Sequence, residues 1–346
     1  MKQKKTLILY GDWLLKKMYY RNNFMVCGVH GQEKCGAYIG FLNTIKNAVD
    51  FLNPDKVIVV WDGVRDGWYK YDSYPDLKLE KKEKWSLNDY VINNSFYTNA
   101  KQEDSACIWD QKIFIQEALD DLCVRQGEET YSEAYDVIAH YTIKAQQEGE
   151  KVFLFGREYD YFQLISDQVY NIIDGKDYVI SVHNFQELYG YDLDNELMLK
   201  SFTGANSSVA RNIKGVTRNK LLKYFPELSK SKVTHNNLIK IIEEKLNKKK
   251  LKLFDSILDS FEDLKANSKV LNMREPYVNV DVENIVEELL YSQMCVDVRN
   301  ISLISKNIKD RGMAIHIDDD LEDFFSTFER LKLKEMEYTK QVAESQ

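Results

Sequence analysis

The run Val57-Ile-Val-Val-Trp61 is apolar at every position and stops at Asp62-Gly63. A short apolar run bounded by turn residues is typical of a strand that is buried on both faces. A second run of this kind, Thr6-Leu-Ile-Leu-Tyr10, precedes it and stops at Gly11-Asp12. Between the two, apolar side chains recur every three or four positions over residues 37–51, which predicts a helix. Strand, helix and strand in this order indicate an α/β fold with a mainly parallel central sheet flanked by helices.

The same alternation continues along the chain. Further helices are expected over residues 108–125 and 132–148, and further strands over 151–155, 169–173 and 178–182. Helical patterns dominate after about residue 185, up to an amphipathic helix from Asp320 to about Glu337.

The length of 346 residues favours two domains, with one large α/β domain as the alternative. The first is expected over residues 1–185, with an excursion from the sheet at about 64–105 that is rich in Tyr, Trp, Lys, Asp and Asn. The second is expected over residues 186–346 as a helical region that ends in the acidic C-terminal helix.

Charge is distributed unevenly along the chain. The formal net charge is −8, yet residues 211–252 contain 13 basic and three acidic side chains, a local charge of +10. The net negative charge argues against a protein that simply coats nucleic acid, whereas the local excess favours a surface for a polyanion. A solvated helix face that is rich in lysine is the alternative.

Several protein classes are not supported. The five cysteines are widely spaced and form no Cys-x-x-Cys pair, so a disulfide framework or a zinc site is not expected. No stretch approaches 18 uncharged apolar residues, so no membrane contact is expected. The N-terminal apolar run is too short for a signal peptide, which predicts a cytoplasmic protein. Scarce Pro with abundant Tyr, Asn and Lys suggests a viral origin, and a phage-encoded protein would lie in the host cytoplasm.

Acidic side chains follow the predicted strands. Asp62 comes directly after the second strand, Asp12 lies two residues past the first, and Glu158 and Asp160 follow the third. Glu133 and Asp136 lie one turn apart on a predicted helix. Carboxylates that meet at the carboxyl edge of a parallel sheet favour Mg²⁺ or Mn²⁺, which support phosphodiester hydrolysis. Ordinary helix caps and loop acids are the alternative.

These motifs resemble those of the bacteriophage and bacterial 5′ nucleases, the flap-endonuclease and 5′→3′ exonuclease family that also includes phage ribonuclease H. The resemblance covers about residues 5–225 and is carried by four segments: Val57-Ile-Val-Val-Trp-Asp-Gly63, Tyr74-Pro-Asp-Leu-Lys78, Glu133-Ala-Tyr-Asp136 and Glu158-Tyr-Asp-Tyr-Phe-Gln-Leu164. It implies a PIN-like fold and Mg²⁺-dependent or Mn²⁺-dependent cutting of 5′ ends and flaps in DNA or RNA–DNA hybrids.

The resemblance also implies site residues. The catalytic acids would be Asp62, Glu133, Asp136, Glu158 and Asp160. Metal ligands would be Asp62, Asp136, Glu158 and Asp160, with Asp12 as a substitute ligand. Nucleic-acid contacts would come from the excursion, which corresponds to the family's arch, and from the basic region: Tyr74, Lys78, Lys81, Lys82, Lys84, Arg211, Lys214, Arg218 and Lys220. For the arch, an exposed helix of balanced charge is the alternative.

The family pattern loses an acid at four positions. Tyr10, Tyr135, Ala205 and Ser208 stand where the family has acids. Tyrosine is neutral at pH 7, so each replacement removes one negative charge from a site that must balance about +4 from two divalent ions. We therefore expect one ion or none, and hydrolysis that is weak or lost.

Two other functions stay open at this point. The first is a fully active Mg²⁺-dependent 5′→3′ exonuclease or flap endonuclease that removes primers or flaps in replication. The second is a non-catalytic subunit of a replication or transcription complex, whose partner protein would bind the acidic C-terminal helix. Against this, the helix's apolar stripe, which includes Phe324, Phe328 and Leu331, is typical of a helix packed on its own core.

Overall fold

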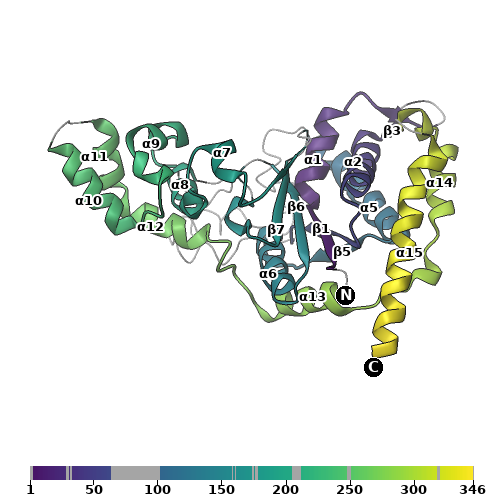
Figure 1. Cartoon of the computed structure of the whole chain (residues 1–346). Coiled ribbons are helices and arrows are strands. Elements are labelled where there is room, and N and C mark those ends of the chain that lie inside the picture. The colour runs from purple at the N-terminus through teal and green to yellow at the C-terminus, as the bar shows by residue number, and fades with distance from the viewer. Residues whose placement is uncertain are drawn as a thin grey trace. The chain divides into compact units, whose positions relative to one another are not determined.

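The structure is a computed structural model, shown in Figure 1. It describes residues 3–28, 31, 33–63, 102–157, 159, 161–173, 175, 178–204, 212–247, 251–317 and 320–345, without the side chains of 102–106 and 338–345.

The chain divides into two compact units. The first contains residues 1–66, 90–156 and 277–346, and the second contains residues 67–89 and 157–276. The units differ from the division at residue 185 that the sequence suggests, because the C-terminal segment belongs to the first unit. Helical periodicity does not reveal which core a helix covers.

The first unit contains a parallel sheet. Its strands are β5 (Arg125–Glu128), β4 (Lys56–Trp61), β1 (Lys5–Tyr10) and β6 (Lys151–Gly156), in this spatial order. Ile8 at the centre of β1 lies opposite Ile58 of β4 and Leu154 of β6, and all three side chains are buried. The predicted parallel sheet and its first three strands are confirmed.

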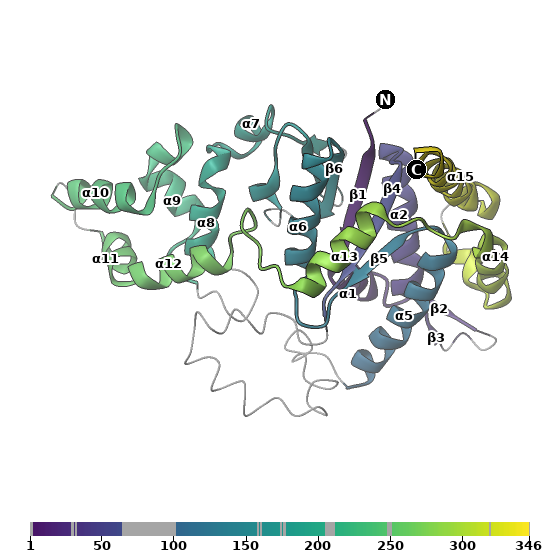
Figure 2. The ribbon, with the colours of Figure 1, turned by 90° about the horizontal axis from the view of Figure 1, so that it is seen from below.

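Helices cover both faces of this sheet. One layer contains α1 (Gly11–Arg21), α2 (Gly36–Leu52) and α5 (Gln102–Asp121), and the other contains α6 (Ala134–Gln147) and α13 (Val280–Tyr291). Figure 2 shows α13 beside α6 and β5, which it contacts although they precede it by more than 130 residues. The unit also contains the hairpin of β2 (Val26–Cys27) and β3 (Glu33–Lys34), and the helices α14 (Ile301–Asp310) and α15 (Leu321–Ser345).

Helix α1, strand β5 and the hairpin of β2 and β3 were not predicted, and one predicted helix end is wrong. Helix α1 starts at Gly11, directly after β1, where the sequence suggests a turn. The helix predicted over 108–125 instead ends at Asp121, because the left-handed backbone of Cys123 (φ 58°) turns the chain into β5. Strand β5 was missed because it has no apolar run. Its Arg125 is buried because it forms an ion pair with Glu335.

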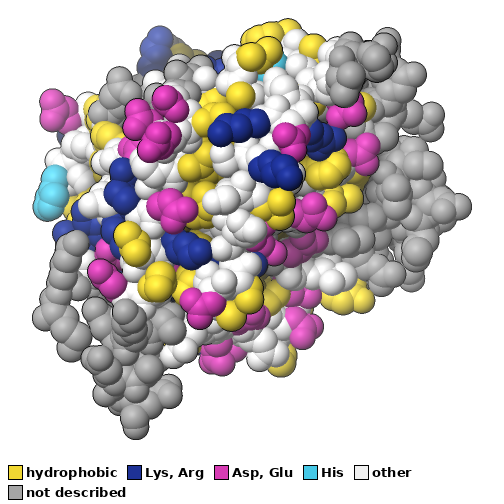
Figure 3. All heavy atoms as spheres, turned by 90° about the vertical axis from the view of Figure 1, so that its right-hand side faces the viewer, with side chains coloured by type: hydrophobic (Ala, Val, Ile, Leu, Met, Phe, Trp, Pro, Cys, Tyr) yellow, Lys and Arg dark blue, Asp and Glu magenta, His cyan; other side chains and the backbone are white. Residues whose placement is uncertain are grey.

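The apolar stripe of α15 packs against the core of its own unit. Phe324, Phe325, Phe328 and Leu331 are buried, and α15 contacts α2 and β4. Figure 3 shows the face that carries α14 and α15, where apolar side chains alternate with basic and acidic ones. The stripe therefore serves the fold, which removes the motive for placing a protein partner on it.

A buried ion pair joins α15 to the edge strand of the sheet. Arg125 of β5 donates from Nε and Nη2 to the two carboxylate oxygens of Glu335, at 3.1 and 2.9 Å. Its Nη1 donates to the carbonyl oxygen of Ser292 at 2.9 Å. Glu335 is only 2% exposed. This bidentate geometry satisfies both charges away from water.

A second buried cation lies at the start of β4. Lys56 is 1% exposed, and its Nζ donates to the Tyr141 hydroxyl at 3.0 Å and to the carbonyl oxygens of Leu289 and Leu290 at the end of α13. Glu150 lies 3.8 Å away. Burial lowers the pKa of Lys56 to about 7, and the Glu150 carboxylate opposes this shift only in part.

Stability should therefore rise with pH relative to a Lys56→Met variant. Between pH 7 and the ordinary lysine pKa of about 10.4, Lys56 binds more protons in the unfolded chain than in the folded chain. This difference lowers the free energy of unfolding, and the loss is largest at the acidic end of the window. The difference in free energy of unfolding, wild type minus variant, should increase by up to about 1.4 kcal/mol per pH unit in this window. Urea unfolding at pH 7, 8 and 9 measures it. A difference that does not vary with pH would show that Lys56 stays charged in the folded protein.

The second unit is mainly helical. Strands β7 (Val169–Ile173) and β8 (Val179–Ile180) form an antiparallel pair, which confirms both predicted strands with a shorter second one. The helices that follow are α7 (Phe185–Tyr189), α8 (Glu196–Thr203), α9 (Arg218–Tyr224), α10 (His235–Leu246), α11 (Lys252–Asp259) and α12 (Phe261–Val270). Phe162, Phe185, Phe202 and Phe225 lie in their common core. In the described part of the chain, no helix has the length and apolar composition that crossing a membrane requires.

Candidate functional site

Two of the predicted acids lie together at the carboxyl edge of the sheet. Asp62 follows β4 and is half-buried, and Asp12 lies in the first turn of α1 and is buried. The backbone N–H of Asp62 donates to Oδ2 of Asp12 at 2.7 Å. We call Asp12 and Asp62 the carboxylate pair. Its position agrees with the expectation that strand ends gather the acids.

Tyr10, one of the replaced acids, contacts this pair directly. Its hydroxyl donates to Oδ2 of Asp62, and the backbone N–H of Ala134 donates to Oδ1 of Asp62 at 3.0 Å. The Tyr10 ring also meets the ring of Tyr135, the second replaced acid, edge to face at 5.0 Å. One of the two replaced acids, Tyr10, therefore contacts Asp62 directly, and the other, Tyr135, packs against the ring of Tyr10.

The electrostatics of Tyr10 and Asp62 follow from burial and proximity. Burial first and then the Asp62 carboxylate raise the pKa of Tyr10 well above its usual range, so its hydroxyl keeps its proton. Burial and then the Asp12 carboxylate raise the pKa of Asp62 to about 7, against the hydrogen bonds from Tyr10 and Ala134, which lower it. The phenol is therefore the hydrogen-bond donor in this contact.

Lys112 of α5 is a site residue that the sequence did not reveal. Its side chain is 4% exposed, and its Nζ lies 3.4 Å from Oδ1 of Asp12 and 3.8 Å from Glu128. The same ammonium faces the rings of Trp61 and Trp109, 4.9 and 5.1 Å from their centroids. No sequence signal links residues 100 positions apart, so only the fold could identify this contact.

The acids of the predicted Glu-Ala-Tyr-Asp segment lie at the start of α6. Glu133 is the N-cap residue and Asp136 is in the first turn, where the helix dipole favours negative charge. Asp136 is buried, and its Oδ1 accepts a hydrogen bond from the backbone N–H of Tyr277 at 3.2 Å.

Gly63 shows why the residue after Asp62 is a glycine. Its N–H donates to the carbonyl oxygen of Ser132 at 3.2 Å, and a Cβ built on it would lie 1.7 Å from the carbonyl oxygen of Glu129. Only glycine allows the segment before α6 to pass this close. This approach places the N–H of Ala134 within hydrogen-bonding distance of Asp62.

The described residues do not fit a divalent-metal site by themselves. All four oxygens of the carboxylate pair already receive a hydrogen bond or an ammonium from the protein. Over the described ranges, no three Asp, Glu, His or Cys side chains converge as a ligand group. Glu158 and Asp160 lie outside the described residues, so the metal roles of the predicted acids stay predictions.

The predicted nucleic-acid contacts are described only in part. Tyr74, Lys78, Lys81, Lys82, Lys84 and Arg211 lie outside the described residues, as do Ala205 and Ser208. Lys214 and Lys220 are exposed, and Lys220 donates to the carbonyl oxygen of Gly215 at 2.7 Å. Further exposed lysines of the second unit are Lys223, Lys230, Lys232 and Lys240.

Arg218 is held within the second unit. Its guanidinium donates to both oxygens of the fully buried Glu196, at 2.7 and 2.8 Å, and to the Tyr191 hydroxyl at 2.6 Å. It also stacks 4.1 Å from the ring centroid of Tyr159. Arg218 was predicted to contact nucleic acid, and these contacts show that it also has a role within the fold.

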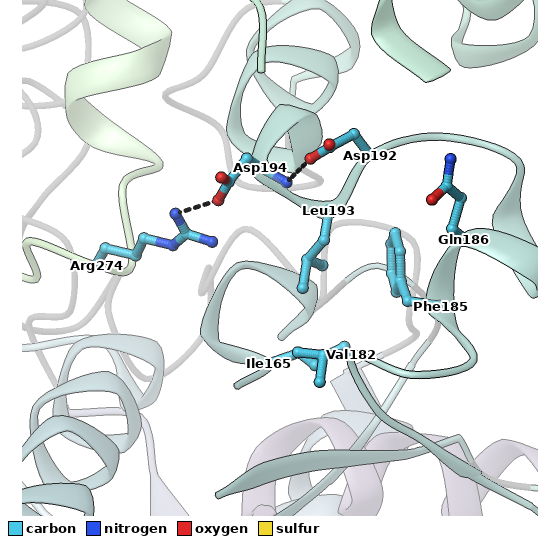
Figure 4. A pocket seen from close by; sticks show the side chains of 8 residues that line it. All are labelled: Ile165, Val182, Phe185, Gln186, Asp192, Leu193, Asp194 and Arg274. Atoms are coloured by element: carbon cyan, nitrogen blue, oxygen red, sulfur yellow. Dashed lines mark hydrogen bonds and ion pairs between the residues drawn. The ribbon is translucent and has the colours of Figure 1, made fainter. Parts of the chain in front are cut away.

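The second unit also contains a cavity of about 340 Å³, drawn in Figure 4. Leu193, Phe185 and Ile165 line its apolar side, and Arg274 pairs with Asp194 at 2.9 Å across its polar side. None of its lining residues is among the predicted catalytic, metal-binding or nucleic-acid-binding residues.

Comparisons with known sequences point to one family. Residues 5–190 match the family model described as 5′-3′ exonuclease, N-terminal resolvase-like domain. A 5′-3′ exonuclease of Buchnera aphidicola is 24% identical over 249 residues, which cover 69% of this chain and 76% of that protein. The thermostable DNA polymerase I of Thermus aquaticus is 30% identical over 139 residues, 39% of this chain and 17% of that protein.

Comparisons with solved structures give the same fold. The 5′-exonuclease of bacteriophage T5, solved with bound zinc, aligns with a TM-score of 0.60 at 16% identity, over 83% of this chain and 98% of that one. Flap endonuclease-1 of Methanococcus jannaschii aligns with a TM-score of 0.51 at 13% identity, over 97% and 94%. A complex of the T5 flap endonuclease with DNA and metal ions aligns with a TM-score of 0.56 at 14% identity, over 95% and 99%. The predicted flap-endonuclease fold is therefore confirmed.

Proposed function

Because the chain belongs to the family of 5′-3′ exonucleases with an N-terminal resolvase-like domain, we propose that it binds DNA, or an RNA–DNA hybrid, that carries a 5′ single-stranded arm. We further propose that its phosphodiester hydrolysis is weak or lost. The hydrogen bond from the Tyr10 hydroxyl to Asp62 is the observation that carries the second part.

The charge of the second unit supports binding of nucleic acid. The local excess of +10 over residues 211–252 includes the exposed Lys220, Lys223, Lys230, Lys232 and Lys240. Exposed lysines contribute to nucleic-acid affinity by neutralising phosphates and releasing counterions. The T5 flap endonuclease, whose fold is similar, has been solved as a complex with DNA.

The carboxylate pair supports weak hydrolysis. A divalent ion bound there would compete with the Tyr10 hydroxyl for Asp62 or with Lys112 for Asp12. Mg²⁺ loses its water reluctantly and demands regular octahedral geometry, so it tolerates such competition less well than Mn²⁺. We therefore expect at most one weakly bound ion.

A fully active Mg²⁺-dependent nuclease is the second candidate. It is favoured by the retention of Asp62 and Asp136 at the carboxyl edge of the sheet and at the start of α6. A non-catalytic interaction subunit has no such observation, because the apolar stripe of α15 is buried.

Binding should weaken steeply as salt rises, and the two groups of lysines should act differently. Lys78→Ala with Lys81→Ala should weaken binding to a 5′-armed duplex more than binding to a blunt duplex. Lys214→Ala with Lys220→Ala should weaken both. Each lost phosphate contact should reduce the slope of log K against log salt by about 0.7 to 0.9. Fluorescence anisotropy across a salt series measures these slopes.

Lys306→Ala on α14 serves as the control, because this exposed lysine lies in the first unit and outside the basic region. It should leave both affinities unchanged. Undetectable binding at low salt, or a Lys78/Lys81 double variant that binds like the wild type, would contradict the proposed substrate.

A further inference from the structure

We propose that Lys112 acts as a built-in cation for the carboxylate pair. Together with the Tyr10 hydroxyl, it balances Asp12 and Asp62 without a divalent ion and weakens the binding of such an ion there. The inference rests on the proposed function. It explains weak hydrolysis by the ammonium of Lys112 and the hydroxyl of Tyr10 at the site, in addition to the loss of carboxylates.

The first step is the environment of Lys112. Its ammonium is buried between the carboxylates of Asp12 and Glu128 and the rings of Trp61 and Trp109. A buried ammonium needs nearby negative charge, and an aromatic face adds further electrostatic attraction. The contacts come from β4, β5, α1 and α5, so the packing of the whole edge holds this ammonium in place.

The second step is the connection from Lys112 to Asp62. Oδ1 of Asp12 faces the ammonium, and Oδ2 of Asp12 accepts the backbone N–H of Asp62 at 2.7 Å. Asp12 therefore links the lysine to the chain segment that carries Asp62. The hydroxyl of Tyr10 and the N–H of Ala134 then hold the two oxygens of the Asp62 side chain.

The third step is the consequence for a divalent ion. An ion bound to Asp12 would lie within a few ångströms of the Lys112 ammonium, at a distance where like charges repel strongly in a water-poor site. An ion bound to Oδ2 of Asp62 would compete with the Tyr10 hydroxyl for the lone pairs of that oxygen. Removing the ammonium or the hydroxyl should therefore increase the affinity for the ion, although no carboxylate is added.

The test is a Mn²⁺ titration of the purified full chain without nucleic acid, followed by electron paramagnetic resonance of free Mn²⁺ and by thermal unfolding. Wild type should bind Mn²⁺ weakly and unfold at the same temperature with EDTA as with Mn²⁺. Lys112→Gln should bind Mn²⁺ on the order of tenfold more tightly and become stabilised by it. Tyr10→Phe should shift the affinity in the same direction.

Two variants serve as matched controls. Lys112→Arg keeps the positive charge and should behave like the wild type. Lys46→Gln removes another lysine of the first unit, whose partner Asp50 lies 3.1 Å away on α2, and should leave Mn²⁺ affinity unchanged. If Lys112→Gln folds only with Mn²⁺, the ion has replaced the ammonium, which supports the proposal.

Tight Mn²⁺ binding by the wild type overturns the proposal, and so does an unchanged Mn²⁺ affinity in Lys112→Gln, whatever Tyr10→Phe does. Because no nucleic acid is present, these outcomes are separate from those of the binding experiment. A wild type that does not bind the 5′-armed duplex, together with tighter Mn²⁺ binding by Lys112→Gln, would reject the proposed substrate and keep the role of Lys112.

Discussion

Cleavage of a 5′-flap DNA by the purified chain is expected to be slow or absent with Mg²⁺, to appear first with Mn²⁺, and to vanish in Asp62→Ala. Asp62 directly follows β4 and accepts a hydrogen bond from the hydroxyl of Tyr10, whose ring contacts Tyr135. Its loss should reduce any Mn²⁺-dependent rate by about a hundredfold or more, because even groups that only support a metal ligand change activity by 10- to 100-fold. Single-turnover assays with a 5′-labelled flap measure the rate.

Two controls separate a loss of chemistry from a loss of fold. Asp62→Asn keeps the shape of the side chain and should lose the same activity, while Asp310→Ala removes an exposed acid of α14 and should have no effect. Turnover with Mg²⁺ of about one per second, at the slow end of typical enzymes, would show that the remaining acids suffice if Asp62→Ala abolished it. The active-nuclease alternative would then be correct.

Glu335→Ala should destabilise the chain by about 3–5 kcal/mol, since it leaves the buried guanidinium of Arg125 without its counter-charge. The guanidinium would keep only its hydrogen bonds to Ser292. Urea unfolding at pH 7 measures the free energy of unfolding. The urea concentration at the midpoint should fall, while the variant should keep the wild-type fold when no urea is present.

Two further variants test the cause of this loss. Glu337→Ala, two residues along α15, removes an exposed acid and should change stability by less than about 0.5 kcal/mol. A double variant with Arg125→Met and Glu335→Met should recover most of the loss, because a buried ion pair contributes little beyond a well-packed apolar pair. Equal losses in Glu335→Ala and Glu337→Ala would mean that the ion pair does not stabilise the contact of α15 with β5.

Local patterns in the sequence predicted the centre of the fold. The apolar runs of β1, β4 and β6 reveal buried parallel strands, because such strands need apolar side chains on both faces. Strand β5 escaped detection, since its Arg125 is buried by pairing with a residue 210 positions later. Helix α1 escaped because Gly11-Asp12 resembles a turn, although Asp12 is favourable in the first turn of a helix.

The candidate site could be predicted as a location but not as a network. The motifs placed Asp12 and Asp62 at one edge of the sheet, and they identified Tyr10 as a lost acid. They did not show that the phenol would bond to Asp62, or that Lys112 would reach Asp12 from α5. Such contacts depend on how distant segments pack, which neither spacing nor periodicity encodes.

The return of residues 277–346 to the first unit has a consequence for synthesis on the ribosome. At about 5–20 residues per second, roughly 10 to 40 seconds separate the translation of Arg125 from that of its partner 210 residues later. Residues 157–276 emerge completely within this interval and are free to fold, while the N-terminal sheet still lacks α13 and α15. A ribosome that stalls late in the message would therefore release a chain whose apolar sheet is only partly covered, the kind of nascent product that chaperones retain.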